Sequence, residues 1–402
     1  MSRVLWITPY PPAFAGGGGH IRQAHLLDAL AAEHEVTVVT AGVVRDERVR
    51  ALAATVVEVP VEARDRGDLG PLSRRVRDLA AAVAARRPRE VADQAPVARA
   101  LARAAAPHVP DADVAVLEYA GLGPLTTSLG LPTVLTLHNL PSRMAGHLAA
   151  ISSGRRRWVH ERDERISLAY ERRVAEASTR AVVVSGQDAA TLDRPCVVIP
   201  NGVDIDVLTP TPLARGAGIV FVGALDTGPN RDGARWLAEA VLPLVRARRS
   251  DAHLEIVGSR PSADVVALGS LEGVTVRPDV PDVRPYLEAA RVAAVAIRIG
   301  SGTRLKALEA MALGRPVVGT SIGLEGLAVE PEVHALVADD AVTFAAALVE
   351  LIEDGPRAEA LAGAGRTLVE DRFGWTAIGA SFSALVREAA TGAHDHSSSS
   401  GP

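Results

Sequence analysis

The sequence predicts an α/β fold made of two doubly wound domains. Short Val-rich runs alternate with longer Ala- and Leu-rich stretches, and this alternation starts a second time after residue 217. The chain of 402 residues is long enough for two or three domains that each bury a core. Because 48% of the residues are apolar and only 3% are aromatic, those cores must consist mainly of Ala, Val and Leu.

The first series of predicted elements fills residues 1–200, which we take as the first domain. A strand at 4–8 leads through a loop rich in Pro and Gly into a helix near 20–33. Val-rich runs predict further strands at 35–40, 55–59, 113–118, 133–137 and 181–185. Apolar residues at helical spacing predict helices near 72–87, 90–106 and 156–177.

The second domain is predicted at 218–375, after a linker at 201–217 in which Pro and Gly interrupt the periodicity. Its strands are expected at 218–225, 252–257, 273–276, 291–297, 316–319 and 334–337. Its helices are expected at 231–248, 302–313, 341–353 and 356–371. A last helix is expected within 376–391, for which packing back on the first domain is one option. The low-complexity segment 392–402 predicts a disordered tail.

Composition and charge limit the location and the partners. The single cysteine, Cys196, indicates a reducing compartment. The absence of a signal peptide and of any long apolar run favours a soluble, cytoplasmic protein. A net charge of −5 with few aromatic residues argues against nucleic-acid binding. Arginines nevertheless cluster at 74–89 and 155–157, and these clusters fit either solvated helix faces or weak contact with an anionic membrane.

The segment 300–316, GSGTRLKALEAMALGRP, contains Lys306, the only lysine in the chain. Ser301 is a suitable N-cap for a helix, and Gly314 with Pro316 two residues later predicts its end. Gly300 and Gly302 would let backbone N–H groups approach an anion at the positive end of this helix. The segment therefore predicts a phosphate site.

Lys306 and Glu309 are three residues apart and so share one helix face. An ammonium group can bind phosphate while a carboxylate accepts hydrogen bonds from a ribose diol, although a surface ion pair would look the same in sequence.

Other unusual residues also follow predicted strands, where doubly wound sheets bind ligands. Gly16–Gly19 follow the strand 4–8, His138 and Asn139 end the strand 133–137, and Asn230 follows the strand 218–225. A flexible loop and a structural histidine are the alternative interpretations.

Taken together, these residues resemble the retaining family 4 glycosyltransferases of GT-B fold. The resemblance covers almost the whole chain and is most specific in 300–327, with support from FVGALDTGPNRDGARWL, VIPNGVD and PYPP…GGGGH. It implies two Rossmann-like domains that face each other across a cleft. The C-terminal domain would bind a nucleoside diphosphate sugar, such as a UDP-sugar, and the N-terminal domain an acceptor. It also implies that no divalent metal is required, so Asp339-Asp340 is interpreted as a loop or helix cap.

The resemblance also assigns roles to residues. Glu309 matches the second glutamate of the family's Glu-x7-Glu motif, which binds ribose. The implied donor-binding residues are Gly18, Gly19, Asn230, Arg231, Gly300, Ser301, Gly302, Thr303 and Glu309. The implied catalytic residues are His138, Lys306 and Arg304, and the residues expected to bind the acceptor are His20, Glu118 and Asn139.

Two departures from the family pattern keep alternatives open. Ser301 stands where the motif has its first glutamate, and Arg231 would have to replace part of an Arg/Lys pair that the family has after the first strand of the C-terminal domain. We expect transfer of a sugar to a natural-product, lipid-linked or polysaccharide hydroxyl, with domain closure near Asn201–Asp204. The alternatives are a non-catalytic nucleotide-sugar-binding partner of another transferase and a GT-B-like sugar-nucleotide epimerase.

Overall fold

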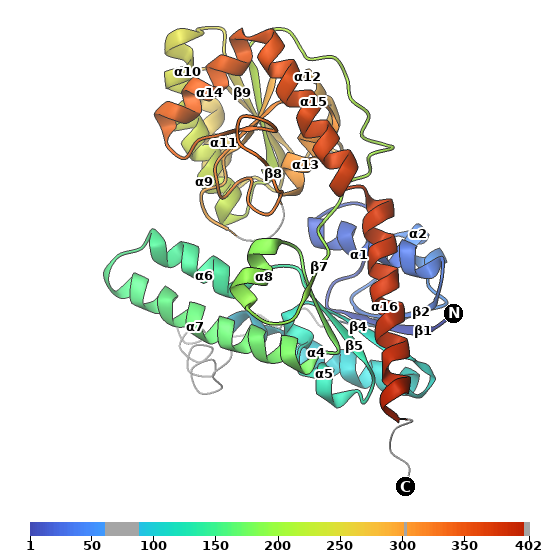
Figure 1. Ribbon diagram of the computed structural model, residues 1–402. Helices are drawn as coiled ribbons and strands as arrows, with labels where there is room; N and C mark the ends of the chain where they lie inside the picture. The colour runs from blue at the N-terminus through green and yellow to red at the C-terminus, as the bar shows by residue number, and fades with distance from the viewer. Residues whose placement is uncertain (61–87, 301–303, 398–402) are drawn as a thin grey trace. The chain divides into compact units, whose positions relative to one another are not determined.

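The computed structural model describes the chain in three stretches, residues 1–60, 88–300 and 304–397. The chain divides into two compact units, which are built around separate parallel sheets (Figure 1). Unit 1 comprises Met1–Pro200 together with Thr376–Pro402, and unit 2 comprises Asn201–Trp375. The α/β class is therefore confirmed. The helix predicted at 72–87 lies outside the described residues.

The sheet of unit 1 has the strand order β3-β2-β1-β4-β5-β6-β7. Its strands are β1 (Arg3–Thr8), β2 (Glu35–Ala41), β3 (Thr55–Val59), β4 (Val114–Glu118), β5 (Thr133–Leu137), β6 (Arg180–Val183) and β7 (Val197–Val198). All neighbouring strands are parallel. The central strands β4 and β5 are buried along their whole length, which explains why they appear in the sequence as continuous apolar runs.

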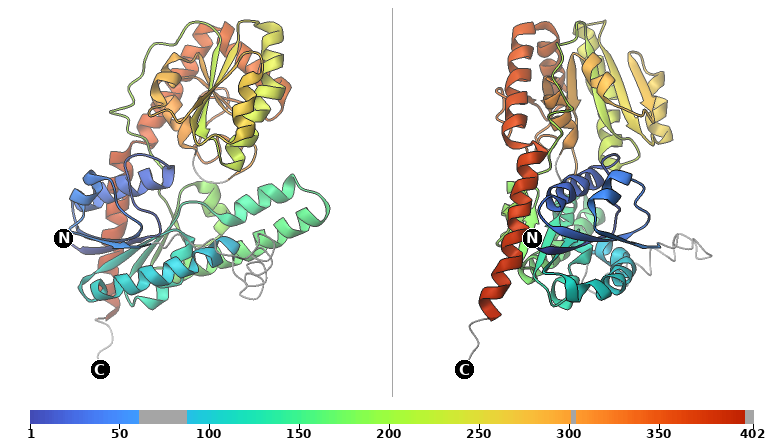
Figure 2. Two further views of the ribbon diagram at one scale, coloured as in Figure 1. Left: turned by 180° about the vertical axis from the view of Figure 1, so that it is seen from behind. Right: turned by 90° about the vertical axis from the view of Figure 1, so that its right-hand side faces the viewer.

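Helices lie on both faces of this sheet (Figures 1 and 2). They are α1 (Gly18–Ala31), α2 (Glu47–Leu52), α4 (Arg89–Ala105), α5 (Leu125–Ser128), α6 (Pro141–Ala150), α7 (Gly154–Ala177), α8 (Gly186–Leu192) and α16 (Trp375–Ser397), with short 3-10 turns η1 (Ala106–Asp111) and η2 (Ala120–Leu122). Sequence analysis missed α6, which forms an antiparallel hairpin with α7. The helix α16 continues to Ser397, into the segment predicted as a disordered tail.

The C-terminal helix α16 supplies part of the core of unit 1. Phe382 on this helix is fully buried, and its ring meets that of Trp6 on β1 edge to face, with 6.1 Å between ring centroids. A Cβ atom added to Gly379 would lie 2.6 Å from the Cβ of Ala29 on α1, so the two helices pack with almost no space between them. The first and the last elements of the chain therefore share one core.

The sheet of unit 2 repeats the same winding, with the order β10-β9-β8-β11-β12-β13. Its strands are β8 (Gly218–Ala224), β9 (His253–Ser259), β10 (Val274–Pro278), β11 (Val292–Val295), β12 (Val317–Gly319) and β13 (Leu336–Val337). Its helices are α9 (Gly228–Trp236), the π-helix η3 (Leu237–Val241), α10 (Leu242–Arg248), α11 (Ala263–Ala267), the 3-10 turn η4 (Leu268–Ser270), α12 (Arg284–Ala289), α13 (Leu305–Ala312), α14 (Ala341–Glu353) and α15 (Gly355–Arg372).

Helix α13 ends as the sequence predicts but begins later. Gly314 has a φ of 68° and donates its N–H to the carbonyl of Met311 at 3.0 Å, while the N–H of Arg315 reaches the carbonyl of Ala310 at 2.9 Å. These two bonds form a left-handed stop that satisfies the last carbonyls. The described helix begins at Leu305, and the predicted start at Gly302 lies outside the described residues.

The segment predicted as an interdomain linker, 201–217, belongs to unit 2. Arg315 is fully buried, and its guanidinium group donates to the carbonyls of Thr211 and Pro212. The N–H of Val203 donates to the carbonyl of Phe373 at 2.8 Å. These bonds attach the segment along its length, so it is an integral part of unit 2 and not a free spacer.

Candidate functional site

In both sheets, the strand order reverses at one point, between β1 and β4 in unit 1 and between β8 and β11 in unit 2. Loops that leave two strands on either side of such a point run to opposite faces of the sheet, and ligands of doubly wound proteins bind in the crevice that results. The predicted glycines at the start of α1 follow β1, Asn230 follows β8, and Lys306 follows β11. The predicted residues thus lie beside the two reversal points.

In unit 2, Lys306 and Asn230 are in direct contact. The Nζ of Lys306 donates to the Oδ1 of Asn230 at 2.6 Å, and the Nδ2 of Asn230 donates to the carbonyl of Ala224 at 2.9 Å. A Cβ atom at Gly223 would lie 2.7 Å from that Nδ2 and 2.9 Å from the Nζ of Lys306. A glycine at this position therefore lets the end of β8, the start of α9 and the start of α13 meet.

The ammonium group of Lys306 is poorly solvated. The side chain is half-buried, not exposed as its predicted place in a cleft suggested, and Nζ lies 4.5 Å from the ring centroid of Phe221. Burial lowers the pKa of Lys306 to about 7, and the charge of Arg304 acts in the same direction. Burial likewise raises the pKa of Glu309 to about 7. A bound anion would restore the full positive charge of Lys306.

Arg304 and Gly300 lie immediately before α13. Gly300 has a φ of 136°, and a Cβ atom added there would lie 3.2 Å from both Nη atoms of Arg304. The Nε of Arg304 donates to the carbonyl of Ile322 at 3.2 Å. This places a guanidinium group at the N-terminal end of α13, where the first backbone N–H groups have no helical partner. The predicted contacts of Ser301, Gly302 and Thr303 lie outside the described residues.

Arg231 has a different partner from the one expected. Its guanidinium group forms two 2.9 Å bonds from Nη2 to the carboxylate of Asp264 on α11, and Arg235 binds the same carboxylate at 2.6 Å. Hydrogen bonds from Ser262 and Arg231 lower the pKa of Asp264 to about 2. The ion pair with Asp264 uses Nε and Nη2 of Arg231, and the expected phosphate contact of this residue stays a prediction.

In unit 1, His138 at the end of β5 stacks on Tyr119, with ring centroids 4.0 Å apart and planes 7° apart. Tyr119 follows β4 and has a φ of 71°, a left-handed conformation that is rare for a bulky residue. A Cβ atom at Gly19 would lie 2.2 Å from the Tyr119 hydroxyl and 3.8 Å from the Nδ1 of His138. Gly19 near the start of α1 therefore lies against this aromatic stack, and sequence analysis missed Tyr119.

Glu118 does not occupy the acceptor-binding position expected for it. The side chain is fully buried at the end of β4, and one carboxylate oxygen, Oε2, contacts the Nε2 of His138 and accepts a hydrogen bond from Thr136 at 2.5 Å. The other oxygen, Oε1, has no hydrogen-bond partner among the described residues. Burial lowers the pKa of the nearby Arg22 to about 10, and the negative charge of Glu118 opposes this shift. Glu118 thus positions His138.

The other two residues expected to bind the acceptor lie near this stack. The Nδ1 of His20 bonds to the carbonyl of Pro11 at 2.6 Å, and its ring meets that of Tyr10 edge to face. Asn139 follows His138 and is half-buried. The acceptor contacts of His20 and Asn139 stay predictions.

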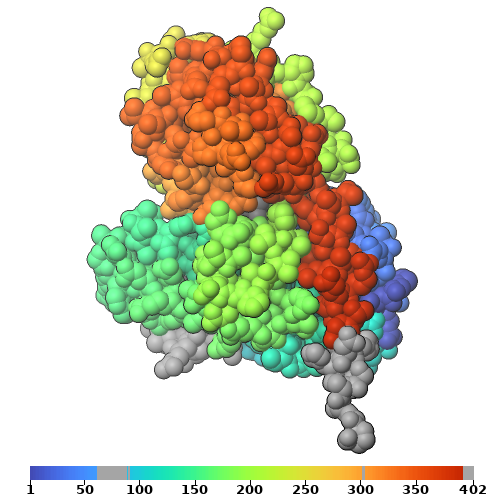
Figure 3. Space-filling view, in the orientation of Figure 1, coloured from blue at the N-terminus to red at the C-terminus, as the bar shows by residue number. Residues whose placement is uncertain are grey.

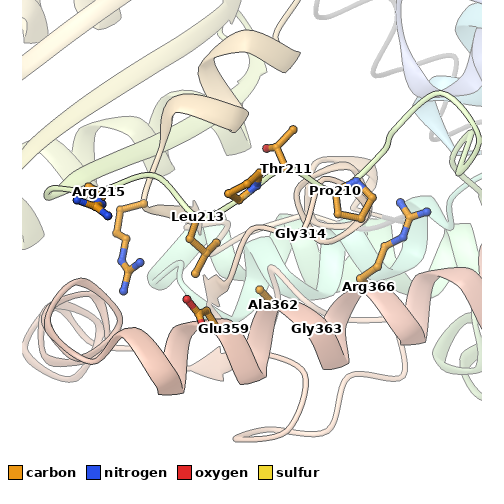
Figure 4. A pocket seen from close by; sticks show the side chains of 11 residues that line it. Pro210, Thr211, Leu213, Arg215, Gly314, Glu359, Ala362, Gly363 and Arg366 are labelled. Atoms are coloured by element: carbon orange, nitrogen blue, oxygen red, sulfur yellow. The ribbon is translucent and has the colours of Figure 1, made fainter.

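Unit 2 also contains an open pocket of about 720 Å³ at the opposite edge of its sheet (Figure 4). Arg291 and Gly314 line it, and they precede β11 and β12. Because the pocket lies at the amino ends of these strands, it is separate from the loops that carry Lys306 and Asn230.

Asp339 and Asp340 are structural, as interpreted from the sequence. Asp340 caps α14 by accepting the N–H groups of Val342 and Thr343, and Asp339 accepts the N–H of Ser321 at 2.8 Å. Across the described stretches, no group of three or more His, Cys, Asp and Glu side chains is arranged to hold a metal ion. None of the helices in those stretches has the length and apolar character needed to cross a bilayer.

Comparison with solved structures defines the fold. The chain is similar over 96% of its length to sucrose-phosphate synthase from Thermosynechococcus elongatus, with 20% identity, 99% of that chain covered and a TM-score of 0.70. It is also similar to Anabaena HepE in complex with UDP and glucose, with 14% identity, 96% and 100% coverage and a TM-score of 0.66. The two units form the GT-B fold of glycosyltransferases.

The chain belongs to the family 4 glycosyltransferases, with residues 16–207 matching the model described as Glycosyltransferase Family 4 and residues 216–354 the model described as Glycosyl transferases group 1. A GDP-mannose-dependent monoacylated alpha-(1-6)-phosphatidylinositol monomannoside mannosyltransferase of Corynebacterium glutamicum is 32% identical over 210 residues, 45% of this chain. That match spans about half, 53%, of the relative. A D-inositol 3-phosphate glycosyltransferase of Thermobispora bispora is 28% identical, with 66% of this chain and 67% of that protein covered.

Proposed function

We propose that this protein transfers a sugar from a nucleoside diphosphate sugar to an acceptor hydroxyl, with retention of configuration. The observation that carries the proposal is the contact between Lys306 and Asn230 at the reversal point of the second sheet. Relatives named as sugar transferases support it. The acceptor would be a lipid-linked, glycan or natural-product hydroxyl. We also propose a cytoplasmic location, for which a single cysteine in the chain is the support.

The donor half of the proposed reaction depends on unit 2. Negative charge develops on the diphosphate as the glycosidic bond breaks. Preorganised hydrogen-bond donors at that position usually make the largest single contribution to stabilising the transition state. The ammonium of Lys306, the guanidinium of Arg304 and the N-terminal N–H groups of α13 would supply this stabilisation. The carboxylate of Glu309, one turn further along the helix, would accept hydrogen bonds from the ribose hydroxyls. Because these groups supply the positive charge, we propose that no divalent metal is needed.

The acceptor half depends on unit 1. An ionised Glu118 can only accept a hydrogen bond, so its contact with Nε2 of His138 favours the tautomer that carries the proton on Nε2. This leaves the lone pair of Nδ1 available on the side of Gly19. We propose that Nδ1 accepts a hydrogen bond from a sugar or acceptor hydroxyl and orients it for transfer.

The test is incubation of the full chain with UDP-, GDP- and dTDP-sugars, followed by chromatography of the nucleotides. Slow release of a free nucleoside diphosphate from one donor supports a transferase, because water can replace a missing acceptor. Recovery of an isomerised donor would instead identify an epimerase. Binding without turnover, with or without a panel of acceptors, would identify a non-catalytic partner. We expect release of the nucleoside diphosphate to continue in the presence of EDTA. Loss of this release in EDTA would contradict metal-independent chemistry.

A further inference from the structure

The helices α6 and α7 form a hairpin that extends from the sheet of unit 1 (Figures 1 and 2). The chain reverses between Ala150 and Gly154, and Gly154 has a φ of 56°, which favours glycine at this turn. We define the hairpin tip as residues 147–160. This tip forms part of the teal surface of unit 1 in Figure 3, and it carries none of the residues placed in the proposed reaction.

The hairpin tip is strongly basic. Its sequence, HLAAISSGRRRWVH, contains three arginines and no acidic residue. Arg155, Arg156 and Arg157 are all exposed, and Arg157 bonds to Glu161 at 2.8 Å. Arg155 and Arg156 have no hydrogen bond or ion pair to any residue within the described part of the chain. Two guanidinium groups therefore face solvent with all their donors available.

Large apolar side chains lie beside these charges. Ile151 is 66% exposed and Trp158 is 58% exposed, and no other tryptophan of the chain is as accessible. Arg155 and Trp158 are three residues apart on α7 and so share one face of the helix. Because most of the Trp158 side chain is exposed beside unpaired arginines, it contributes little to the core of unit 1, which indicates that its partner lies outside the chain.

We propose that the hairpin tip docks on the anionic surface of a lipid bilayer. Arginine binds lipid phosphates with two parallel hydrogen bonds, and tryptophan prefers the interfacial region, where its ring is apolar and its N–H remains wet. The combination of basic residues with exposed Trp and Ile is typical of segments that lie on membranes without crossing them. A nucleic acid is a poorer match, because the chain as a whole carries a charge of −5. This proposal does not depend on the sugar-transfer chemistry.

Flotation of the full chain with vesicles tests the proposal. We compare phosphatidylcholine alone with phosphatidylcholine that contains about 30% phosphatidylglycerol. Binding is expected only to the anionic vesicles, and Arg155→Gln with Arg156→Gln should weaken it roughly 25-fold. The matched control is Arg215→Gln with Arg248→Gln, which removes the same charge from two exposed arginines of unit 2 and should leave binding unchanged. An equal loss of vesicle binding in the two double variants would overturn the proposal that the hairpin tip is the docking surface.

Tryptophan fluorescence provides a second readout. Anionic vesicles should shift the emission to the blue as Trp158 enters the interface, and Trp158→Ala should remove this shift while circular dichroism stays unchanged. High salt, about 0.5 M, should weaken docking because it screens exposed charges. No binding to anionic vesicles, or a blue shift that survives in Trp158→Ala, would overturn the proposal. Binding of a labelled RNA that depends on Arg155 and Arg156, without vesicle binding, would assign the tip to nucleic acid instead.

Discussion

Lys306 combines two properties that rarely occur together, a positive side chain and a setting that removes water from it. The hydrogen bond to Asn230 and the ring of Phe221 hold its Nζ beside Gly223, where a side chain would not fit. Such a group gains more from a bound anion than a solvated lysine does, since the anion replaces the solvation that burial removed. The affinity for a diphosphate should therefore depend on the protonation of this one residue.

The affinity for UDP should fall as the pH rises above 7. Free Lys306 has a pKa of about 7, so it is charged below this pH and neutral above it. Binding of the diphosphate favours the ammonium form, which must take up a proton at higher pH. Each pH unit above 7 should therefore weaken binding by up to about tenfold, until the pKa of the complex is reached. Titration calorimetry from pH 6 to 9 measures this.

The variant Lys306→Met provides the control for this pH dependence. It keeps the length of the side chain but carries no charge, so its affinity should be weak and nearly flat over the same range. A slope in Lys306→Met equal to that of the wild type would show that a group other than Lys306 is responsible.

Glu118→Gln should lower kcat roughly 100-fold while leaving UDP affinity unchanged. A glutamine can donate its amide N–H to Nε2 of His138, which favours the opposite tautomer and removes the lone pair from Nδ1. The control is Thr136→Val, which loses the other hydrogen bond to the same oxygen but keeps the carboxylate. Steady-state kinetics of both variants test whether Glu118 positions His138. Equal kcat values in Glu118→Gln and the wild type would exclude this role.

Sequence reasoning located some of these residues and not others, for physical reasons. Lys306 and Asn230 could be predicted because lysine and asparagine are rare in this chain and both residues follow strands. The role of Tyr119 depends on a stack and a positive φ that only the tertiary structure creates. The pairing of Arg231 with Asp264 joins residues 33 positions apart, so nothing local in the sequence indicates it.

At the scale of the elements, the strands other than the two-residue β7 were predicted within a few residues, because parallel strands are buried on both faces and appear as apolar runs. Helix α6 was missed because its short, Ala-rich sequence has no long apolar period. The predicted start of α13 at Gly302 lies outside the described residues and stays a prediction. Its end was predicted correctly, since a glycine followed by Arg315 and a proline leaves the helix no way to continue.

The left-handed stop at Gly314 should matter for the stability of unit 2. Gly314→Ala places a Cβ in a left-handed conformation and 3.2 Å from the Cβ of Pro210, so it should lower the free energy of unfolding by roughly 1–2 kcal/mol. Gly363→Ala, inside α15 with nothing within 4 Å, is the control and should raise stability by about 0.5–1 kcal/mol. Urea unfolding measures both variants, and a neutral Gly314→Ala would contradict the strain argument.

At the scale of the whole molecule, α16 makes the N-terminal unit depend on the end of the chain. Phe382→Ala should destabilise unit 1 by roughly 3–5 kcal/mol, because it empties a fully buried site against Trp6. Ser381→Ala alters the exposed side of the same helix and should change stability by less than about 0.5 kcal/mol. Differential scanning calorimetry should show one transition lowered in Phe382→Ala, and identical melting of both variants would argue against a shared core.

The shared core of β1 and α16 also bears on how the protein is made. A ribosome adds about 5–20 residues per second, so on the order of 10–30 s pass between release of the first 200 residues and arrival of Phe382. During that interval the nascent N-terminal half presents the Trp6 side of its sheet without the helix that covers it. Unit 2 can therefore complete its packing first, although it is translated second. The N-terminal half stays exposed to chaperones and proteases until the last helix has been synthesised.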